Sequence, residues 1–214
     1  HGAVFVTTRI NRMFAVVQWC LIAGLSERRW YEKHNAHHVN PNHEGHDPDV
    51  NIPFIMDKRQ AENRGAFFNK YILPYQQILF WSVLPTVYFY NILNSFKHLL
   101  KDFDRRAMVE VFLIVVHFVG LFYITFTLLP FWAGAFFIAG NFIAVGTYMS
   151  LAFAPNHKGE EVIMPDVAYD WTFQITSTHN IYPDPLAFFL LGGLDYQVEP
   201  HLFPAMSRQN YHKA

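Results

Sequence analysis

The chain has 214 residues, of which 52% are hydrophobic and only 15% charged, a composition more apolar than that of a typical soluble domain. A formal net charge of −1 and the lack of a basic stripe with interleaved aromatic residues argue against a nucleic-acid-binding protein. Cys20 is the single cysteine, which excludes an intrachain disulfide framework and a cysteine-rich zinc or iron–sulfur site. The mean hydropathy is only slightly positive. The apolar residues must therefore be concentrated in segments, as in a polar head on a membrane base.

The first part of the chain alternates between apolar and polar segments. Residues 13–25 form an apolar run too short to cross the ~30 Å hydrocarbon core, which needs about 20 helical residues, so we expect a buried or re-entrant helix or half of a span. Residues 26–64 are polar and belong in water. Residues 66–96 are rich in aromatic residues and interrupted by prolines, which favours an interfacial helix, with an ordinary span as the alternative.

The clearest pattern is a pair of long apolar segments, residues 107–129 and 131–154, which predict a transmembrane hairpin. The residues before it include Lys97, Lys101, Arg105 and Arg106, whereas its turn carries no charge. The positive-inside rule therefore places the basic end in the cytoplasm, and two crossings return the chain to that face. Inside the first segment, His117 is expected to make a hydrogen bond between helices.

Three histidines, His34, His37 and His38, are spaced so that they share one face of a helix. A packed core gains nothing from three adjacent titratable rings, whereas imidazole is a ligand for zinc, copper, iron and nickel. The pattern predicts a metal site, with a solvated loop or a structural zinc clip as the alternative. The turn signals Asn40-Pro41-Asn42 and Asp47-Pro48-Asp49 should end the helix soon after His38.

The predicted topology brings His157, His179 and His201 to the same membrane face as the first histidines. So many imidazoles exceed what one tetrahedral zinc takes, which implies two metals. Carboxylates that could orient the rings are available at Asp47, Asp49, Asp170, Asp195 and Glu199. A histidine-rich metal pair above a membrane indicates oxygen chemistry on a lipid, because attack on an unactivated C–H bond requires a redox-active metal.

The histidine segments resemble those of a known family. His34-Asn35-Ala36-His37-His38 with its trailing turns is similar to the second histidine box of the membrane fatty-acid desaturases, and residues 197–204 are similar to the third. The third box begins with Gln197, as in the front-end and acyl-CoA branch. His1-Gly2-Ala3 resembles the tail of the first box, so we expect a fragment that lacks its N-terminus and its C-terminal end.

The resemblance implies an all-α, multi-pass membrane protein with a cytoplasmic, histidine-rich di-metal head. Residues 1–214 as a whole would form part of a single desaturase domain. It implies two iron ions, O2 as co-substrate, a fatty-acyl substrate in membrane lipid, and electrons from a ferredoxin or a b-type cytochrome. The implied iron ligands are His1, His34, His37, His38, His157 and His201, with His179 as a further candidate. The implied partners of these ligands are Gln197, Asn156, Glu199 and Asp195.

One departure concerns the third box, where Pro200 replaces the first member of a histidine pair. Proline offers no ligand and no backbone donor, so either the site is impaired, or His179 or a water completes it. The other histidines that match no box are expected to be solvated: His43, His46, His98 and His212. The alternatives to a desaturase are a related hydroxylase or ketolase, a catalytically inactive lipid- or metal-binding protein, and a haem cytochrome, whose axial ligands would need histidines inside the spans.

Overall fold

The computed structural model describes residues 4–50, 64–168, 170–181 and 184–214. Within these ranges the chain is helical with irregular connections and contains no β-strand, which confirms the all-α prediction. The chain forms two compact units. We call residues 33–84 and 150–214 the head unit, and residues 2–32 and 85–149 the hairpin unit.

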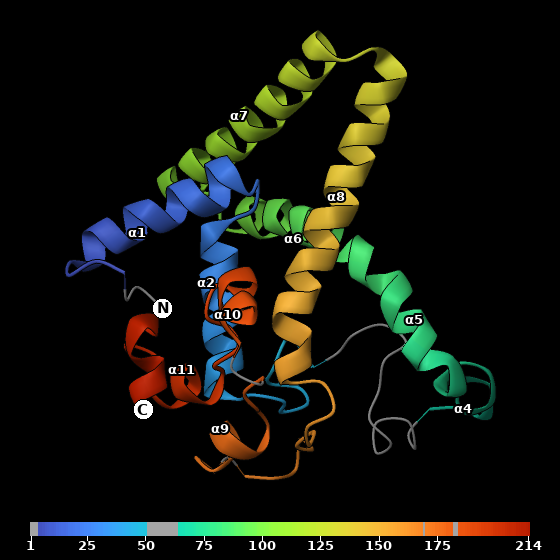
Figure 1. The fold of residues 1–214 in the computed structure, drawn as a ribbon, viewed down its shortest axis with the longest axis vertical. Coiled ribbons are helices and arrows are strands. Elements are labelled where there is room, and N and C mark those ends of the chain that lie inside the picture. Colours follow the sequence, from blue (N-terminus) through green and yellow to red (C-terminus); the bar gives the residue numbers. More distant parts are fainter. Residues whose placement is uncertain (1–3, 51–63, 169, 182–183) are drawn as a thin grey trace. The chain divides into compact units, whose positions relative to one another are not determined.

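The hairpin unit takes its name from α7 (Arg105–Leu128) and α8 (Phe131–Phe153), two long helices joined by a short connection (Figure 1). Asp104 caps α7 by accepting a hydrogen bond of 2.8 Å from the backbone N–H of Ala107. Near the connection the helices pack closely, since a Cβ on Gly134 would lie 2.7 Å from the Phe126 ring. Both helices are long and apolar enough to cross a membrane, and most of their side chains are not buried within the protein.

The N-terminal segment of the hairpin unit is α1 (Thr8–Val16), which continues as a π-helical stretch, η1 (Val17–Ile22). Gly24 then adopts φ +66°, and a Cβ there would lie 2.6 Å from the His117 ring, so only glycine fits this turn. His117 Nδ1 lies 3.0 Å from the carbonyl oxygen of Leu21, which confirms the predicted hydrogen bond between helical segments. This turn leads the chain into α2 (Glu27–Val39).

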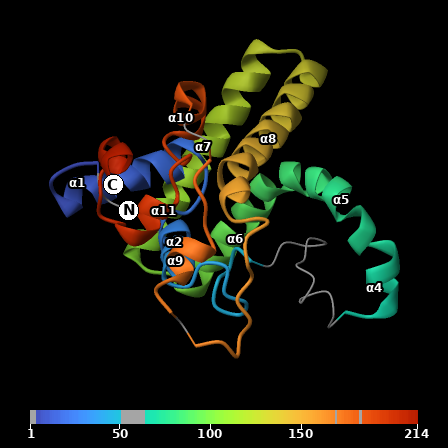
Figure 2. The same cartoon turned by 60° about the horizontal axis from the view of Figure 1, so that its bottom comes forward.

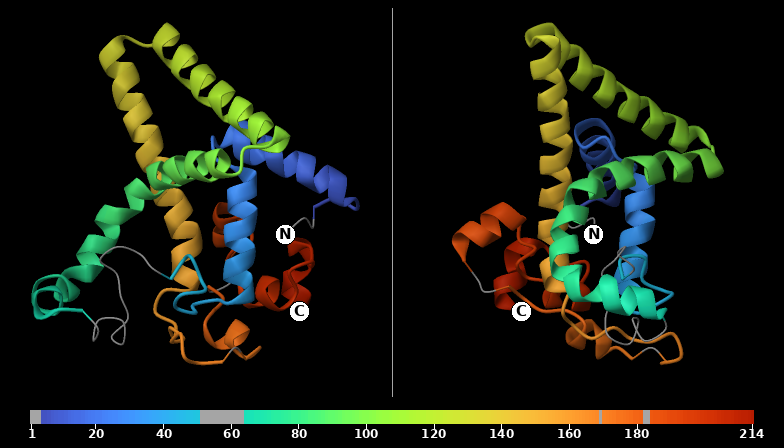
Figure 3. Two further views of the ribbon diagram at one scale, coloured as in Figure 1. Left: turned by 180° about the vertical axis from the view of Figure 1, so that it is seen from behind. Right: turned by 90° about the vertical axis from the view of Figure 1, so that its right-hand side faces the viewer.

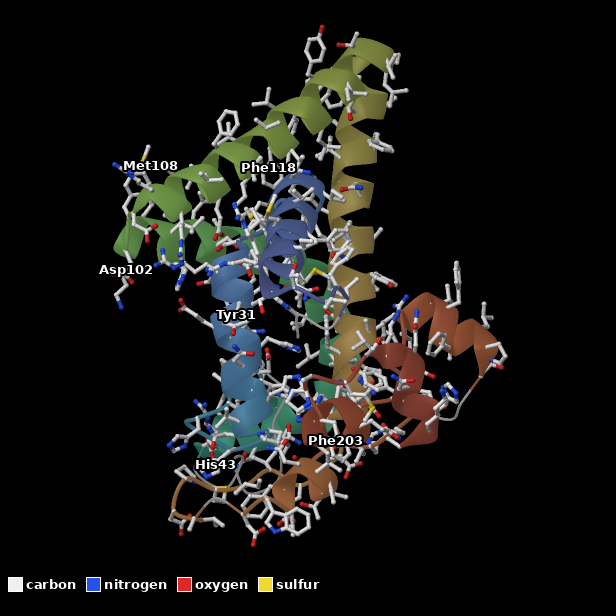
Figure 4. The ribbon with its side chains drawn as sticks, turned by 90° about the vertical axis from the view of Figure 1, so that its left-hand side faces the viewer. Tyr31, His43, Asp102, Met108, Phe118 and Phe203 are labelled. Carbon is white, nitrogen blue, oxygen red and sulfur yellow. The ribbon has the colours of Figure 1, made fainter. Side chains whose placement is uncertain are left out.

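The core of the hairpin unit consists of two apolar clusters. Leu99, from α6 (Val87–Lys101), packs with Ala107 and Ile114 of α7 in the first cluster. The second cluster joins Tyr88 of α6 to Leu25. Figure 4 labels Phe118, which packs against both clusters from α7.

The aromatic stretch 66–96 is not one helix. It is divided into α4 (Ala66–Tyr71), η2 (Leu73–Tyr75), α5 (Gln76–Val83) and η3 (Leu84–Thr86) before α6 begins (Figure 3). The divisions lie at Pro74 and Pro85, because proline lacks the N–H that a helix interior needs. Phe67 and Trp81 are largely exposed, and the interfacial position of this segment stays a prediction.

The C-terminal part of the head unit consists of short helices: η4 (Ala154–Asn156), α9 (Phe173–Thr176), α10 (Pro185–Leu191), α11 (Val198–Leu202) and η5 (Arg208–Lys213). Asp184 caps the start of α10, and Gly192, with φ +65°, ends it. Helices α9 and α11 pack on each other. Figure 2 shows both beside the C-terminal end of α2.

Candidate metal centre

Helix α2 positions the first histidines because both of its ends are fixed by local sequence. The hydroxyl of Ser26 accepts a hydrogen bond of 3.1 Å from the backbone N–H of Arg29, as an N-cap does. The helix ends at Val39, and Pro41 and Asn42, with φ +53°, follow it. The predicted end soon after His38 is therefore confirmed, and the histidines occupy the last two turns.

Three buried rings converge in the head unit. His37 comes from α2, His157 follows η4, and His201 lies on α11. They are 5%, 8% and 5% exposed, and each offers a ring nitrogen within 4.8 Å of the others. This group, which we call the histidine triad, has the density of a metal site.

Two further rings of α2 adjoin the triad. The Nε2 atoms of His34 and His38 lie 3.1 Å apart. The ring centroids of His38 and His201 are 4.1 Å apart. The structure thus brings together His34, His37, His38, His157 and His201, which we call the histidine cluster.

The hydrogen bonds of the triad determine which nitrogen of each ring carries the proton. His37 Nδ1 lies 2.8 Å from a carboxylate oxygen of Asp47. His157 Nδ1 lies 3.4 Å from the Ser177 carbonyl oxygen, and His201 Nδ1 lies 2.9 Å from the side-chain oxygen of Gln174. Each of these partners is an acceptor, so in each neutral ring Nδ1 donates and Nε2 keeps a lone pair.

The inward nitrogens are therefore arranged as ligands. His37 Nε2 and His157 Nε2 are 3.2 Å apart, although both carry lone pairs, and this arrangement is favourable when a cation lies between them. His201 Nε2 is buried and has no hydrogen-bond partner among the described residues. A buried acceptor without a donor is costly, and a bound metal removes that cost. The donor set fits a metal that prefers imidazole.

The electrostatics keep the rings in the neutral form that binds metal. Burial, reinforced by His37 and His157, lowers the pKa of His38 to about 3. Burial and the neighbouring His37 lower the pKa of His157 to about 3. Burial, followed by the other rings, also lowers the pKa of His34 and of His201.

The carboxylate of Asp47 contacts the histidine triad through His37. Burial alone would raise its pKa, but the hydrogen bond from His37 and two backbone N–H donors, from Asn42 and Asp49, hold the pKa below its usual value. An ionised Asp47 is the partner that fixes the tautomer of His37.

Of the four residues that the resemblance implied as partners of the iron ligands, Gln197 contacts a ring of the histidine cluster. The side-chain nitrogen of Gln197 is 3.3 Å from His157 Nε2. Asn156 is fully buried and donates to the Leu194 carbonyl oxygen at 2.7 Å. Glu199 accepts from the side chain of Asn180. Asp195 is buried and contacts none of the rings through a hydrogen bond among the described residues.

The remaining histidines have separate surroundings. His179 Nδ1 lies 2.7 Å from a carboxylate oxygen of Glu160, and His1 is outside the described residues. The prediction that His43 is solvated is wrong, because His43 is 4% exposed and its Nε2 lies 3.1 Å from the Val167 carbonyl oxygen. Figure 4 labels His43 in the turn after α2.

Sequence reasoning missed Gln174 and Ser177. Gln174 donates to the His38 carbonyl oxygen at 2.9 Å and accepts from His201, so it links α9 to two of the helices that carry histidines. The sequence offered little signal for them, because Gln174, Ser177 and Thr178 lie among other polar residues in the segment 171–180. All three are buried, which identifies them as internal hydrogen-bond partners.

The chain is similar to known proteins along its whole length. The family model described as fatty acid desaturase matches residues 1–214. The Delta(6)-fatty-acid desaturase fat-3 of Caenorhabditis elegans is 32% identical over 88% of this chain and 46% of its own length. The acyl-lipid (9-3)-desaturase of Physcomitrium patens is 29% identical over 100% of this chain and 42% of its own length.

A third relative is the Delta(5) fatty acid desaturase fat-4 of Caenorhabditis elegans, 27% identical over 98% of this chain and 50% of its own length. The chain thus spans about half the length of the curated relatives that it matches. No solved structure matches it.

Proposed function

We propose, because this chain belongs to the fatty acid desaturase family, that the protein uses O2 to introduce a double bond into a fatty-acyl chain carried as an acyl-CoA or an acyl-lipid. The relatives described above are themselves named as desaturases. The proposal treats residues 1–214 as part of one desaturase domain.

The observation that carries the proposal is the histidine triad, with its Nε2 atoms facing inward and its Nδ1–H groups bonded outward. The residues that would hold two irons are His34, His37, His38, His157 and His201, with His1 as a further ligand. Bound iron would supply the redox chemistry with O2 that cleavage of an unactivated C–H bond needs, with electrons from a ferredoxin or a b-type cytochrome.

The chain's own residues prepare the rings for that role. Asp47, Ser177 and Gln174 each hold a proton on Nδ1, so that Nε2 remains unprotonated. Burial of the triad keeps water away from the reacting atoms and keeps the rings neutral. We assign Gln197 and Asn156 to the positioning of His157, from the contact of Gln197 with that ring and the position of Asn156 next to it in the chain.

We further propose that the protein is a multi-pass membrane protein whose active site faces the cytoplasm. Support comes from two helices that are long and apolar enough to span a membrane, Arg105–Leu128 and Phe131–Asn156. Basic residues precede the first of them, and none lies in the connection at residues 129–130.

Pro200 favours one alternative, a catalytically impaired homologue. It is buried in α11, where the first turn has N–H groups without intrahelical partners, so proline costs no backbone hydrogen bond there. Pro200 nevertheless contributes no imidazole. Product formation distinguishes the two functions, since an impaired homologue would form no unsaturated product.

The test is product formation by the full-length protein in a host of defined fatty-acid composition, with gas chromatography of the cellular fatty acids. A new unsaturated fatty acid is expected from the unaltered protein and none from His201→Ala. His98→Ala is the matched control, because His98 lies in the hairpin unit beside Glu32 and should leave the product unchanged. An iron-loaded, reduced protein that forms no unsaturated product would overturn the proposal.

A further inference from the structure

Asn42, a residue of the head unit outside the histidine cluster, contacts two of the groups that orient the clustered rings. It lies in the turn after α2, directly before His43, which Figure 4 labels. Asn42 is 3% exposed, so its polar groups are shielded from water. Buried polar groups need partners within the protein, and the partners of Asn42 connect it to the histidine triad.

The backbone of Asn42 holds the acceptor of His37. The Asn42 N–H donates to Asp47 Oδ2 at 2.8 Å. The same oxygen atom lies 2.8 Å from His37 Nδ1 and keeps the proton on that nitrogen. A second backbone bond fixes Asn42 itself, because its carbonyl oxygen accepts from the Ile163 N–H at 2.9 Å. A movement of Asn42 would therefore move the carboxylate that orients His37.

The side chain of Asn42 holds the acceptor of His157. Its Nδ2 atom donates to the Ser177 carbonyl oxygen at 3.2 Å, and that oxygen lies 3.4 Å from His157 Nδ1. Nδ2 also donates to the carbonyl oxygen of His157 at 3.0 Å. A primary amide nitrogen carries two N–H groups, so both bonds can form at once. The amide thus fixes both the backbone of His157 and the partner of its ring.

One residue therefore couples the orientations of two rings. The Nε2 atoms of His37 and His157 are 3.2 Å apart, and each points inward because its Nδ1–H is bonded outward. A binding site functions only when its groups are held within about 0.5 Å of the required geometry. Asn42 contacts both of the outward acceptors, so it determines how the two lone pairs lie relative to each other.

The conformation of the turn explains why asparagine occupies this position. The φ of Asn42 is +53°, in the left-handed region, where asparagine and aspartate are enriched over other residues with side chains. Glycine adopts this φ without strain but has no side-chain donor. Aspartate has the same size, but its oxygens have no hydrogen to donate to the two carbonyl oxygens. Asparagine combines the conformation with two donors on a short side chain.

A role confined to forming the turn does not account for these contacts. The side chain of an asparagine that forms a turn bonds the backbone about two residues away. The side-chain donors of Asn42 instead reach the carbonyl oxygens of His157 and Ser177, 115 and 135 positions away. Both partners belong to the surroundings of a triad ring, which indicates a role in the metal centre.

We propose that Asn42 is a positioning residue of the metal centre, because it fixes the two acceptor atoms that orient the rings of His37 and His157. The inference deepens the proposed function and rests on the assignment of the histidine triad as a metal site. It is independent of which acyl chain is the substrate.

The test measures how tightly the full-length protein in detergent binds Fe(II) and Co(II), by competition with a chelator under anaerobic conditions. The visible absorption spectrum of bound Co(II) reports the geometry of the ligands. Asn42→Gly keeps the conformation of the turn but removes both side-chain donors, so affinity for both metals should fall by about tenfold or more. The Co(II) spectrum should change in position or intensity.

A second variant, Asn42→Asp, keeps the size of the side chain and tolerates the same φ. It should lower metal affinity at least as much as Asn42→Gly, because its carboxylate faces two carbonyl oxygens. Thermal unfolding of the metal-free protein shows which variants are folded. If Asn42→Gly is not folded, Asn42→Asp decides the test by the same two measurements.

The matched control is Asp184→Ala, which also removes two hydrogen bonds within the head unit, those from the N–H groups of Leu186 and Ala187. Metal affinity should change by less than about twofold and the Co(II) spectrum should stay the same, because Asp184 contacts neither acceptor. A merely structural role for Asn42 would lower the unfolding temperature of Asn42→Gly while leaving affinity and spectrum as in the control. That result would overturn the proposal.

The outcomes for this inference and for the proposed function can be told apart. If the unaltered protein binds no metal, both the metal centre and the role of Asn42 are wrong. If it binds metal and Asn42→Gly binds it equally well, the role of Asn42 alone is wrong. Weaker binding by Asn42→Gly, with no unsaturated product from the unaltered protein, would support the role of Asn42 and contradict the desaturase activity.

Discussion

The head unit and the hairpin unit differ in what they bury. The head unit encloses polar rings, with His37, His157 and His201 each less than 9% exposed. The hairpin unit leaves apolar side chains outside, with Phe136 77% exposed and Leu128 74% exposed. The two units therefore suit different surroundings: the buried rings of the first could bind a metal, and the exposed apolar helices of the second are long enough to cross a hydrocarbon phase.

Each unit contains a buried carboxylate that accepts hydrogen bonds from residues of the same unit. In the head unit, Asp47 accepts from His37 and from backbone N–H groups. In the hairpin unit, Glu110 is 4% exposed and accepts from the hydroxyl of Ser26 at 2.7 Å and the N–H of Arg28 at 3.3 Å. In both cases, donors from the same unit converge on the buried carboxylate and offset the cost of its burial.

The largest expected effect is the loss of a triad ligand. In the full-length protein, His37→Ala should lower iron affinity by about a hundredfold or more, because it removes both a ligand and the ring that pairs with Asp47. Iron content after dialysis against a chelator measures this effect. His98→Ala, in the hairpin unit, should retain its iron. Equal iron in the two variants would contradict the ligand assignment.

The second largest effect is expected at Asp47, which accepts the hydrogen bond from His37 Nδ1. Asp47→Asn keeps the size of the side chain but weakens the bond that holds the proton on His37 Nδ1, so iron affinity should fall by about 10- to 100-fold. The same chelator competition measures this change. Asp166→Asn is the control, since it removes an exposed charge. The prediction fails if Asp47→Asn binds iron as tightly as that control.

In the hairpin unit, Glu110→Ala should leave the Ser26 hydroxyl and the Arg28 N–H without their acceptor. Each unpaired buried group costs about 1–3 kcal/mol, so the melting temperature in detergent should fall by several degrees. Glu110→Gln keeps an acceptor and should lose less. A melting temperature for Glu110→Ala equal to that of Glu161→Gln, in the head unit, would show that the contacts contribute nothing.

A smaller effect on iron affinity is expected at Pro200, which replaces a histidine in the third histidine box. Pro200→His should raise iron affinity by up to about tenfold, since it adds an imidazole beside His201. His179→Ala should leave iron unchanged, because the ring of His179 is paired with Glu160. Loss of iron in His179→Ala, without any gain in Pro200→His, would instead assign the vacant position to His179.

The smallest effect is on stability in mild acid. The pKa of His38 and of His157 is lowered to about 3 in the folded protein, against about 6.5 when unfolded. Between these values the unfolded chain binds more protons, so the metal-free protein loses stability as the pH falls, by less than about 1 kcal/mol per ring from pH 7 to 6. Thermal unfolding of the metal-free protein at the two pH values measures this. A more stable protein at the lower pH would contradict the assignment of neutral rings.

The features of the fold that depend on local sequence could be predicted. The apolar segments 107–129 and 131–154 correspond closely to α7 and α8, because an unbroken apolar run is itself the signal for a long helix. The end of α2 followed from Pro41 and Asn42. The division of residues 66–86 into short helices at Pro74 and Pro85 was not resolved in advance, since each proline can either bend a helix or end it.

The candidate site was predictable only in part. The spacing of His34, His37 and His38 identifies ligands on one helix, because helical neighbours are fixed by the backbone. The partners Gln174 and Ser177 depend on contacts across the fold; the bond from Gln174 to His38 joins residues 136 positions apart. No local pattern determines which glutamine or carbonyl will meet a given ring.

The separation of the ligands along the chain has a consequence for the order of events during biosynthesis. His37 and His157 are 120 positions apart, and His201 follows only on α11. A ribosome has therefore completed α7 and α8 before the last ring of the triad exists. Because chains begin to fold while they are being made, the hairpin can form before the triad is complete, and all three rings could hold a metal only after α11 has been synthesised. A nascent chain that stalls before α11 would carry the hairpin but only two rings of the triad.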